Sequence, residues 1–151
     1  MIFERKRRAE TVNQQIKELM SVYRDAVKNL SVSESEFWIW YTLVAMDGEY
    51  TQQEIGRMWS LPKQTVNTVI AHLRRARYAY LEAVPGKRTH KLIRLTEEGR
   101  RYGETLIRPI ARAEERAFES MPPADRATVI GVIGKYIERL RGELTAETGR
   151  G

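Results

Sequence analysis

The chain has 151 residues with a net charge of +6, 42% hydrophobic residues and no cysteine. This length suffices for one domain with a buried core, and the missing cysteines exclude disulfides, thiolate nucleophiles and cysteine-ligated zinc. No apolar run approaches the roughly 20 residues that cross a bilayer, so we expect a cytoplasmic protein without a membrane partner.

The first two predicted elements are helices. Apolar residues recur three or four positions apart from Thr11 onward, which indicates an amphipathic helix ending near Leu30. Ser33 and Glu36 form a capping-box pattern, in which each side chain satisfies a backbone N–H at the helix start. The run FWIWYTLVAM, residues 37–46, is apolar on every side and predicts a central helix that is buried all round.

A short third helix follows. Thr51 and Glu54 repeat the capping-box pattern, and the helix should end near Trp59. We expect its inward-facing side chains to be Ile55, Met58 and Trp59.

The stretch SLPKQTVNTVIAHLRR, residues 60–75, predicts a helix with two different faces. Pro62 suits its first turn, where the missing N–H is not needed. At about 100° per residue, one narrow face collects the apolar residues Val66, Val69, Ile70 and Leu73. The other side collects residue types that bond bases or phosphates in a major groove, namely Lys63, Gln64, Thr65, Asn67, Thr68, Ala71, His72 and Arg75. An ordinary surface helix would show the same period.

A basic hairpin is predicted next. Residues 79–84 and 91–95 have the pattern of two short strands, and Pro85 and Gly86 suit the turn between them. Residues 57–101 carry 11 Lys and Arg side chains against 3 acidic ones, which is the whole positive excess of the chain. Such a localised basic block favours a polyanion partner, with a merely solvated basic surface as the alternative.

Two further helices complete the prediction. Thr96 caps the first, which Pro109 should kink or interrupt, and MPPAD separates it from a last helix with a frayed tail from Thr145. Gly131 and Gly134 lie inside the last helix, where each is destabilising by about 1 kcal/mol relative to alanine. Close approach of another helix would offset this, and two tolerated glycines on a solvent face are the alternative.

A short capped helix, a turn, a helix with a polar face and a basic hairpin together describe a winged helix-turn-helix. In this order the sequence resembles the MarR family of bacterial transcription regulators. The resemblance rests on TQQEIGRMWSLPKQTVNTVIAHLRRARY and GKRTHKLIRLTEEGRR, residues 51–78 and 86–101, and above all on IRLTEEG.

The resemblance implies a mostly α fold with a small β-hairpin wing and a helical dimerisation lobe formed by the N- and C-terminal helices. Residues 1–151 would be a single domain, with a winged helix-turn-helix core at about 33–98 and dimerisation helices at about 9–31 and 97–145. The homodimer would bind a pseudo-palindromic operator in double-stranded DNA, most simply as a repressor. Its interface would include Ile16, Leu19, Gly131, Gly134, Ile137 and Leu140.

The wing would lie along the minor groove through Lys87, Arg88, Thr89 and His90. Family members usually carry Asp-x-Arg near the wing tip, but this chain has no such acid. The minor-groove role then falls to Arg88, with Lys87 as the competitor. The family also tends to have glycine after the recognition helix, where this chain has Arg77, so the helix is expected to end differently.

The resemblance also implies a small aromatic or phenolic effector that binds near the junction of the two lobes. Candidate pocket residues are Tyr23, Phe37, Trp38, Trp40 and Tyr41, and plain core packing is the alternative for each of them. No other cofactor and no metal site is expected, because neither of the two histidines has a second ligand at metal spacing.

No enzyme motif is found, so we expect a non-enzyme. The basic residues 5–8 would be either a DNA-touching arm or a solvated end. The alternative function from a different class is a winged-helix interaction module that docks an acidic protein partner.

Overall fold

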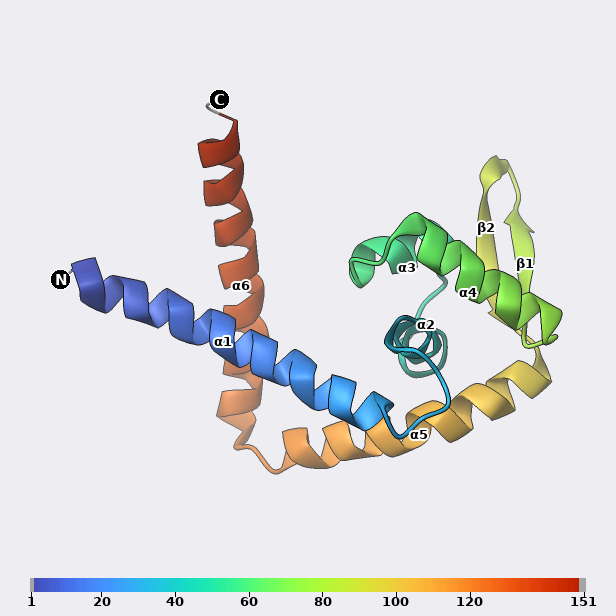
Figure 1. The fold of residues 1–151 in the computed structure, drawn as a ribbon, viewed down its shortest axis with the longest axis horizontal. Helices are drawn as coiled ribbons and strands as arrows, with labels where there is room; N and C mark the ends of the chain where they lie inside the picture. Colours follow the sequence, from blue (N-terminus) through green and yellow to red (C-terminus); the bar gives the residue numbers. More distant parts are fainter. Residues whose placement is uncertain (1, 150–151) are drawn as a thin grey trace. The chain divides into compact units, whose positions relative to one another are not determined.

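The computed structural model describes the backbone of residues 2–149 and the side chains of residues 8–149. Within this part the chain forms six helices and one hairpin (Figure 1), in the order α1 (Ile2–Val27), α2 (Glu34–Ala45), α3 (Gln52–Met58), α4 (Lys63–Arg75), β1 (Ala79–Val84), β2 (Lys87–Leu95), α5 (Glu97–Glu119) and α6 (Pro123–Thr148). There are two compact units, one up to residue 110 and one from residue 111 on. The predicted fold class, mostly helical with a small antiparallel hairpin, is confirmed.

Helix α2 is the centre of the first unit. No side chain from Phe37 to Val44 is exposed, and Phe37, Ile39 and Trp40 are completely buried. Figure 1 shows α2 end-on, between α4 and the first part of α5. Buried apolar residues from the surrounding elements complete this core, namely Ile55, Ile70, Leu73, Ile93 and Ile107. The predicted central helix is present, but it is not buried all round, because Tyr41, Leu43, Val44 and Met46 are half-buried and Ala45 is exposed. Each fully buried apolar side chain contributes roughly 1.5–3 kcal/mol.

Two capping boxes were predicted, and one is complete. At the start of α3, Thr51 Oγ1 accepts from the Glu54 N–H and the Glu54 carboxylate accepts from the Thr51 N–H. At the start of α2, Ser33 Oγ accepts from the Glu36 N–H at 3.2 Å. The Glu36 carboxylate instead accepts from Trp40 Nε1 at 3.3 Å. The second box is therefore only half formed, because a buried indole N–H needs an acceptor.

The turn between α3 and α4 uses one left-handed residue. Ser60 has a φ of +51°, and the Leu61 N–H donates to the Gly56 carbonyl at 2.9 Å. Pro62 lies one residue before α4 as its N-cap rather than in its first turn. The inward placement of Met58 is wrong, since its side chain is 40% exposed at the end of α3.

Helix α4 ends in a Schellman motif built around Arg77. Arg77 has a φ of +60°, its N–H donates to the Arg74 carbonyl at 3.0 Å, and the Tyr78 N–H donates to the Leu73 carbonyl at 2.9 Å. Glycine is the usual residue at this position because it has no Cβ to clash. The different helix end expected from the missing glycine is therefore wrong: arginine adopts the same left-handed conformation.

Thr96 joins the end of α4 to the start of α5. Its N–H donates to the Tyr78 carbonyl at 3.0 Å, and its hydroxyl donates to the Arg77 carbonyl at 2.8 Å. The same hydroxyl oxygen accepts from the Gly99 N–H at 3.0 Å, which confirms the predicted cap. A Cβ on Gly99 would lie 2.0 Å from the Tyr78 carbonyl oxygen, so this close approach requires glycine.

The wing consists of β1, β2 and the turn between them. Strand β2 begins at Lys87, four residues earlier than predicted, and Lys87 pairs with Val84. The next pair along the ladder is Ala83 with Lys91. Residues 88–90 therefore lie between two ladder pairs without a partner in β1 and form a bulge near the tip.

The base of the wing is held by the segment before α3. The Ile93 N–H donates to the Tyr50 carbonyl at 2.9 Å, and Thr51 forms an isolated antiparallel bridge with Leu92. Ile93 is buried, so β2 is attached to the core at this point.

Three helices differ from the sequence-based expectation. Helix α1 includes the basic residues 5–8, whose types all favour helix, and ends before Leu30. Helix α5 continues through Pro109, which is exposed, so the Thr105 carbonyl that loses its partner can bond to water. Helix α6 extends past Thr145 to Thr148 rather than fraying.

The Arg77→Gly variant should raise the free energy of unfolding by about 1 kcal/mol, because glycine adopts a positive φ without steric penalty. Urea unfolding followed by circular dichroism would measure this. Arg77→Ala is the matched control, since it removes the same charge but keeps the strained backbone. Equal stabilisation by both variants would contradict the backbone explanation.

Candidate nucleic-acid interface

The two predicted faces of α4 are present in the structure. Val66, Val69, Ile70 and Leu73 are buried, as predicted from their spacing. On the other side, Thr65 and Ala71 are half-buried. The remaining candidate contact residues are exposed, namely Lys63, Gln64, Asn67, Thr68, His72 and Arg75. We call these six residues the reading face.

One residue of the reading face is already engaged within the helix. The Thr68 hydroxyl donates to the Gln64 carbonyl at 2.9 Å. Its proton is therefore used locally, while its oxygen can still accept a hydrogen bond. The amides of Gln64 and Asn67 offer both a donor and an acceptor, which is the pattern that pairs with adenine in a major groove.

The basic side chains near the reading face are available for an external partner. Among the ion pairs found between described residues, none includes Lys63, Arg74, Arg75, Lys87, Arg88 or Lys91. Their charges are therefore not neutralised by direct contact with a carboxylate of any residue whose side chain the structure describes, and a polyanion could bind them without breaking one of these ion pairs.

The wing tip presents all four residues expected of it. Lys87, Arg88, Thr89 and His90 are exposed, and the last three form the bulge of β2. Thr89 Oγ1 lies 3.2 Å from His90 Nδ1, within hydrogen-bonding distance. The bulge moves these side chains off the regular ladder.

An arginine–carboxylate cluster lies at the base of the wing rather than at its tip. Arg94 on β2 pairs with Glu82 on β1 and, at 2.7 Å, with Glu49 before α3. The two carboxylates, Glu82 above all, raise the pKa of Arg94 above its ordinary value. The sequence analysis missed this cluster, although the acid and the base occupy neighbouring positions on the same face of a predicted hairpin.

A cleft of about 700 Å³ lies between α3, α4 and the wing. Two reading-face residues, Lys63 and Asn67, line it together with Thr89 and His90 of the wing. The cleft also brings in residues that the sequence analysis did not select, namely Gln52, Gln53, Arg57 and Lys91. The only sequence signal for Arg57 and Lys91 was the basic excess of residues 57–101, and nothing in the sequence analysis pointed to Gln52 or Gln53.

The Glu54 carboxylate interacts electrostatically with two residues that line this cleft, Arg57 and His90. Its pKa is lowered, chiefly because it accepts a hydrogen bond from the Thr51 backbone N–H. The Thr51 hydroxyl and the charges of His90 and Arg57 lower it further, while partial burial acts in the opposite direction.

The candidate effector residues separate into two groups. Trp38 contacts the rings of Tyr23, Phe37 and Tyr41 at centroid distances of 4.9–5.5 Å and stacks on Trp59 at 4.3 Å. We call these five residues the aromatic cluster. Trp40 is not part of it and packs against two tyrosines, Tyr78 and Tyr102. The sequence analysis missed Trp59 as a cluster member because this contact joins α2 to the end of α3.

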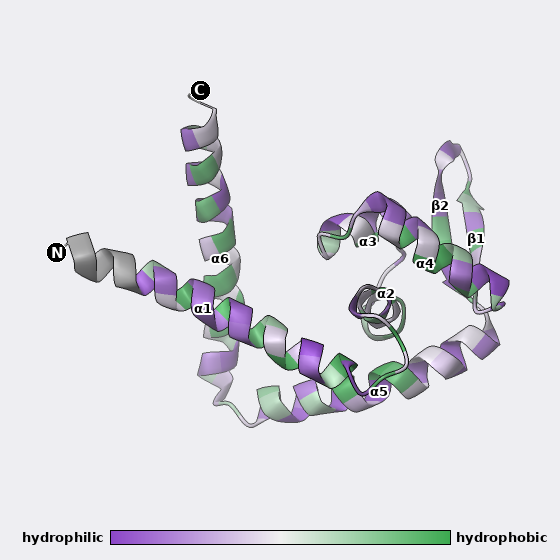
Figure 2. Ribbon diagram, viewed as in Figure 1, coloured by the Kyte–Doolittle hydropathy of each residue, from purple (hydrophilic) through white to green (hydrophobic). Residues whose placement is uncertain are grey.

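The candidate dimer residues lie on exposed helix faces. In α1, Ile16 and Leu19 are 39% and 51% exposed. In α6, all of whose residues are described, no residue is buried, and Figure 2 shows hydrophobic segments along this helix. A Cβ on Gly131 or Gly134 would meet nothing within 4 Å in the single chain. Large exposed apolar faces of this kind mark interaction surfaces.

The described residues contain no group of three or more histidine, aspartate or glutamate side chains placed to hold a metal ion. No helix in the described part of the chain has a stretch long and apolar enough to span a membrane.

Comparison with known proteins gives structural relatives only. No family model matches the sequence, and no curated protein matches it. Among solved structures, NMB1585, a MarR family regulator from Neisseria meningitidis, is 24% identical with a TM-score of 0.76, covering 93% of this chain and 98% of its own. A MarR/EmrR family transcriptional regulator from Acinetobacter sp. ADP1 is 17% identical with a TM-score of 0.66, covering 91% and 96%.

A third similar structure is that of BpsR from Bordetella bronchiseptica, whose DNA binding is regulated by 6-hydroxynicotinic acid. It is 16% identical with a TM-score of 0.59, and the match covers 85% of this chain and 91% of BpsR. The chain therefore has the fold of MarR family regulators, as its sequence resemblance implied.

Proposed function

We propose that this protein is a MarR-type transcription regulator that binds a pseudo-palindromic operator in double-stranded DNA as a homodimer, most simply as a repressor. The observation that carries the proposal is the two-sided character of α4, with its apolar residues buried and its reading face exposed. The unpaired basic side chains around this face and the regulation of DNA binding in BpsR, a protein of the same fold, support it.

In this proposal the reading face enters a major groove. Gln64 and Asn67 bond base edges, and Arg75 bonds guanine or a phosphate. The wing lies over the neighbouring minor groove, where Arg88 is the main contact and Lys87 the second. Contacts with phosphates set the affinity and its salt dependence, whereas contacts with base edges set the sequence preference.

Substitutions on α4 and in the wing should have different effects. Gln64→Ala or Asn67→Ala should relax the base preference at one operator position and weaken operator binding by about 1–3 kcal/mol. Arg88→Ala should weaken binding to all duplexes similarly and reduce the salt slope by about 1. Selection from a random duplex pool, followed by fluorescence anisotropy titrations, would measure both.

An inverted repeat in the selected pool, with half-sites about one helical turn apart, would support a dimeric reader. If all three variants behave alike, the assignment of roles is wrong. If the protein binds no duplex but binds an acidic protein, the winged-helix interaction module replaces the regulator.

The proposed homodimer would bury the exposed apolar faces of α1 and α6. Leu19 on α1 and Ile137 on α6 are 51% and 45% exposed, and α6 carries further exposed apolar residues, namely Val129, Ile130, Val132, Ile133, Leu140 and Leu144. Gly131 and Gly134 would allow a helix of the partner to approach closely. In a two-fold dimer each of these residues is buried in both subunits.

Ile137→Glu should convert the dimer to a monomer. Burying one isoleucine contributes roughly 1.5–3 kcal/mol, and both copies are replaced, so the dimer Kd should rise by about two orders of magnitude or more. Sedimentation equilibrium would measure this. Glu138→Gln on the same helix is the control and should leave the Kd unchanged. A wild-type protein that remains monomeric at micromolar concentration would contradict the proposed dimer.

We assign the effector role to the aromatic cluster. Trp59 stacks on Trp38 and its Nε1 donates to Thr42 Oγ1 at 2.6 Å, so it connects α2 with the turn that starts α4. An aromatic ligand inserted between the rings of the cluster would move Trp59 and hence the start of α4. The ligand must then change the affinity for the operator by the same factor by which the operator changes the affinity for the ligand.

Titration with 6-hydroxynicotinic acid and other hydroxylated aromatic acids should quench tryptophan fluorescence and change operator affinity by about 5- to 150-fold. Trp38→Phe should remove most of the quenching, whereas Trp40→Phe, outside the aromatic cluster, should preserve it. A compound that quenches the tryptophan fluorescence of the aromatic cluster yet leaves operator affinity unchanged would contradict the coupling.

A further inference from the structure

The direction of the wing depends on how its base is attached. An isolated two-stranded hairpin is marginally stable in water, so contacts with the rest of the chain decide where β1 and β2 point. Figure 1 shows the hairpin with its tip clear of the helices. The tip has no anchor of its own, because residues 88–90 lie outside the ladder and residues 85–91 contain no carboxylate that could orient Arg88.

The first attachment of the base runs along β2. The Ile93 N–H donates to the Tyr50 carbonyl at 2.9 Å, and Leu92 forms its bridge with Thr51. Both contacts lie on the same edge of the same strand. A hairpin held along one edge can still rotate about that edge, and the apolar contacts of its inner face are not directional.

The second attachment is the arginine–carboxylate cluster on the outer face of the wing. Side chains alternate between the two faces of a strand, so Arg94 points outward next to the buried Ile93. Its ladder partner is Tyr80, and Glu82 follows two residues later on the same face of β1. This diagonal spacing is within the reach of a long side chain.

Arg94 uses two different nitrogens for its two partners. Its Nε donates to Glu82 on β1, and its Nη2 donates to Glu49 Oε1 at 2.7 Å. Glu49 belongs to the segment between α2 and α3, so one guanidinium links both strands of the wing to the start of the helix-turn-helix. A single exposed ion pair contributes little, but the planar fork of arginine holds two carboxylates in one fixed geometry.

We propose that Arg94 is the positioning residue of the wing, and that together with Glu49 and Glu82 it holds Arg88 in the direction that reaches the minor groove. The inference rests on the proposed DNA-binding function and gives the cluster a role in it, in which Arg94 itself touches no nucleic acid. The cluster fixes the strand that carries Arg88, whereas an acid at the tip would fix only the side chain.

The base of the wing is where a small restraint has the largest effect. Arg88 precedes Arg94 by six residues, which is roughly 20 Å of extended strand. A rotation of about 10° at the base therefore moves the tip by about 3 Å, which is the length of a hydrogen bond. Loss of the second attachment is enough to take Arg88 out of contact.

The charges of the cluster allow a test in which the sign of the result decides. A carboxylate beside a surface that binds a polyanion weakens binding by repulsion. Replacing Glu49 or Glu82 by its amide therefore has two opposite consequences. Loss of the repulsion tightens duplex binding, whereas loss of the positioning contact weakens it.

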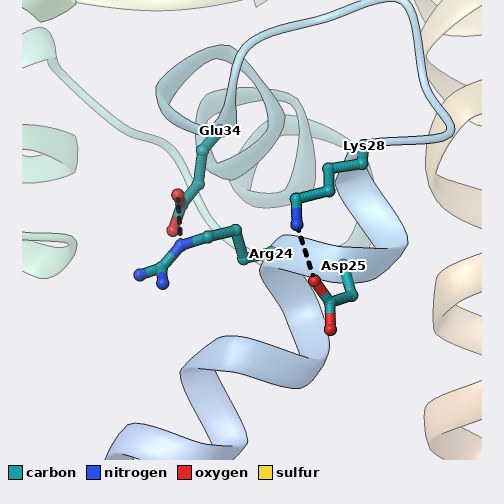
Figure 3. Close-up of polar contacts among 4 residues, drawn as sticks. All are labelled: Arg24, Asp25, Lys28 and Glu34. Atoms are coloured by element: carbon teal, nitrogen blue, oxygen red, sulfur yellow. Dashed lines mark hydrogen bonds and ion pairs between the residues drawn. The ribbon is translucent and has the colours of Figure 1, made fainter.

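Glu49→Gln and Glu82→Gln should each weaken binding to the selected operator by about two- to fivefold, measured by fluorescence anisotropy at 0.1 M salt. Asp25→Asn is the matched control. The Asp25 carboxylate accepts from Lys28 Nζ at 3.0 Å in an exposed ion pair outside the wing (Figure 3), so this variant removes the same charge without touching the cluster. Its operator affinity should equal that of the wild type.

A double-mutant cycle tests whether the cluster acts through Arg88. In the Arg88→Ala background, Glu49→Gln should no longer weaken operator binding, because the contact that the cluster positions is already absent. If Glu49→Gln weakens binding by the same factor in both backgrounds, the two residues act independently and the proposal is wrong.

Hydrogen exchange of the free protein, followed by mass spectrometry, gives a readout without DNA. Arg94→Gln should accelerate exchange of the amides of residues 83–92 by about two- to fivefold, while the amides of α4 keep their wild-type rates. Arg94→Lys keeps the charge but not the fork, and should restore part of the protection. Wing amides that exchange at the wild-type rate in Arg94→Gln would contradict the proposal.

The outcomes separate this inference from the function on which it rests. If the wild type binds the operator and Glu49→Gln binds it equally well or more tightly, the cluster does not position the wing and the proposed function stands. If the wild type binds no duplex at any salt concentration, both fail.

Discussion

The burial of the inner face of α4 is the interaction on which the rest of the site depends. Val66, Ile70 and Leu73 are almost completely inaccessible, and α4 packs against both α2 and α3. Because this face packs the helix against the core, the polar side can remain in solvent without loss of stability. This contact fixes the positions of the reading face and of the α4 wall of the cleft, and with them the distance from α4 to the wing.

Both ends of α4 are fixed by backbone geometry as well as by packing. Ser60 and Arg77 adopt left-handed conformations at the two connections, and Thr96 ties the second connection to α5 and β2. At the first connection, Trp59, the member of the aromatic cluster at the end of α3, directly precedes the turn. Trp59 is thus linked to α2 by its ring and its N–H, whereas the wing is held by a separate set of hydrogen bonds.

Local signals in the sequence predicted the parts of the fold that depend on local physics. The period of α4 and the caps at Thr51 and Thr96 could be recognised because they involve residues three or four positions apart. The bulge of β2 and the contact of Trp59 with Trp38 could not, since each depends on pairing between elements. The Glu36–Trp40 bond has local spacing, but the preference of Glu36 for the indole over the helix cap depends on the burial of Trp40, which local spacing does not give. The same limit applies to the cleft, whose lining comes from three elements and whose members have no common spacing.

The bulge of β2 has a consequence for how proteins of this kind could diverge. Residues 88–90 lie outside the ladder, while Ile93 and the ladder on either side of the bulge fix the strand to the core. Insertions, deletions or substitutions confined to this short segment would leave the register, and therefore the inward direction of Ile93, unchanged. The tip can thus change in sequence and length while the body that carries it retains its stability.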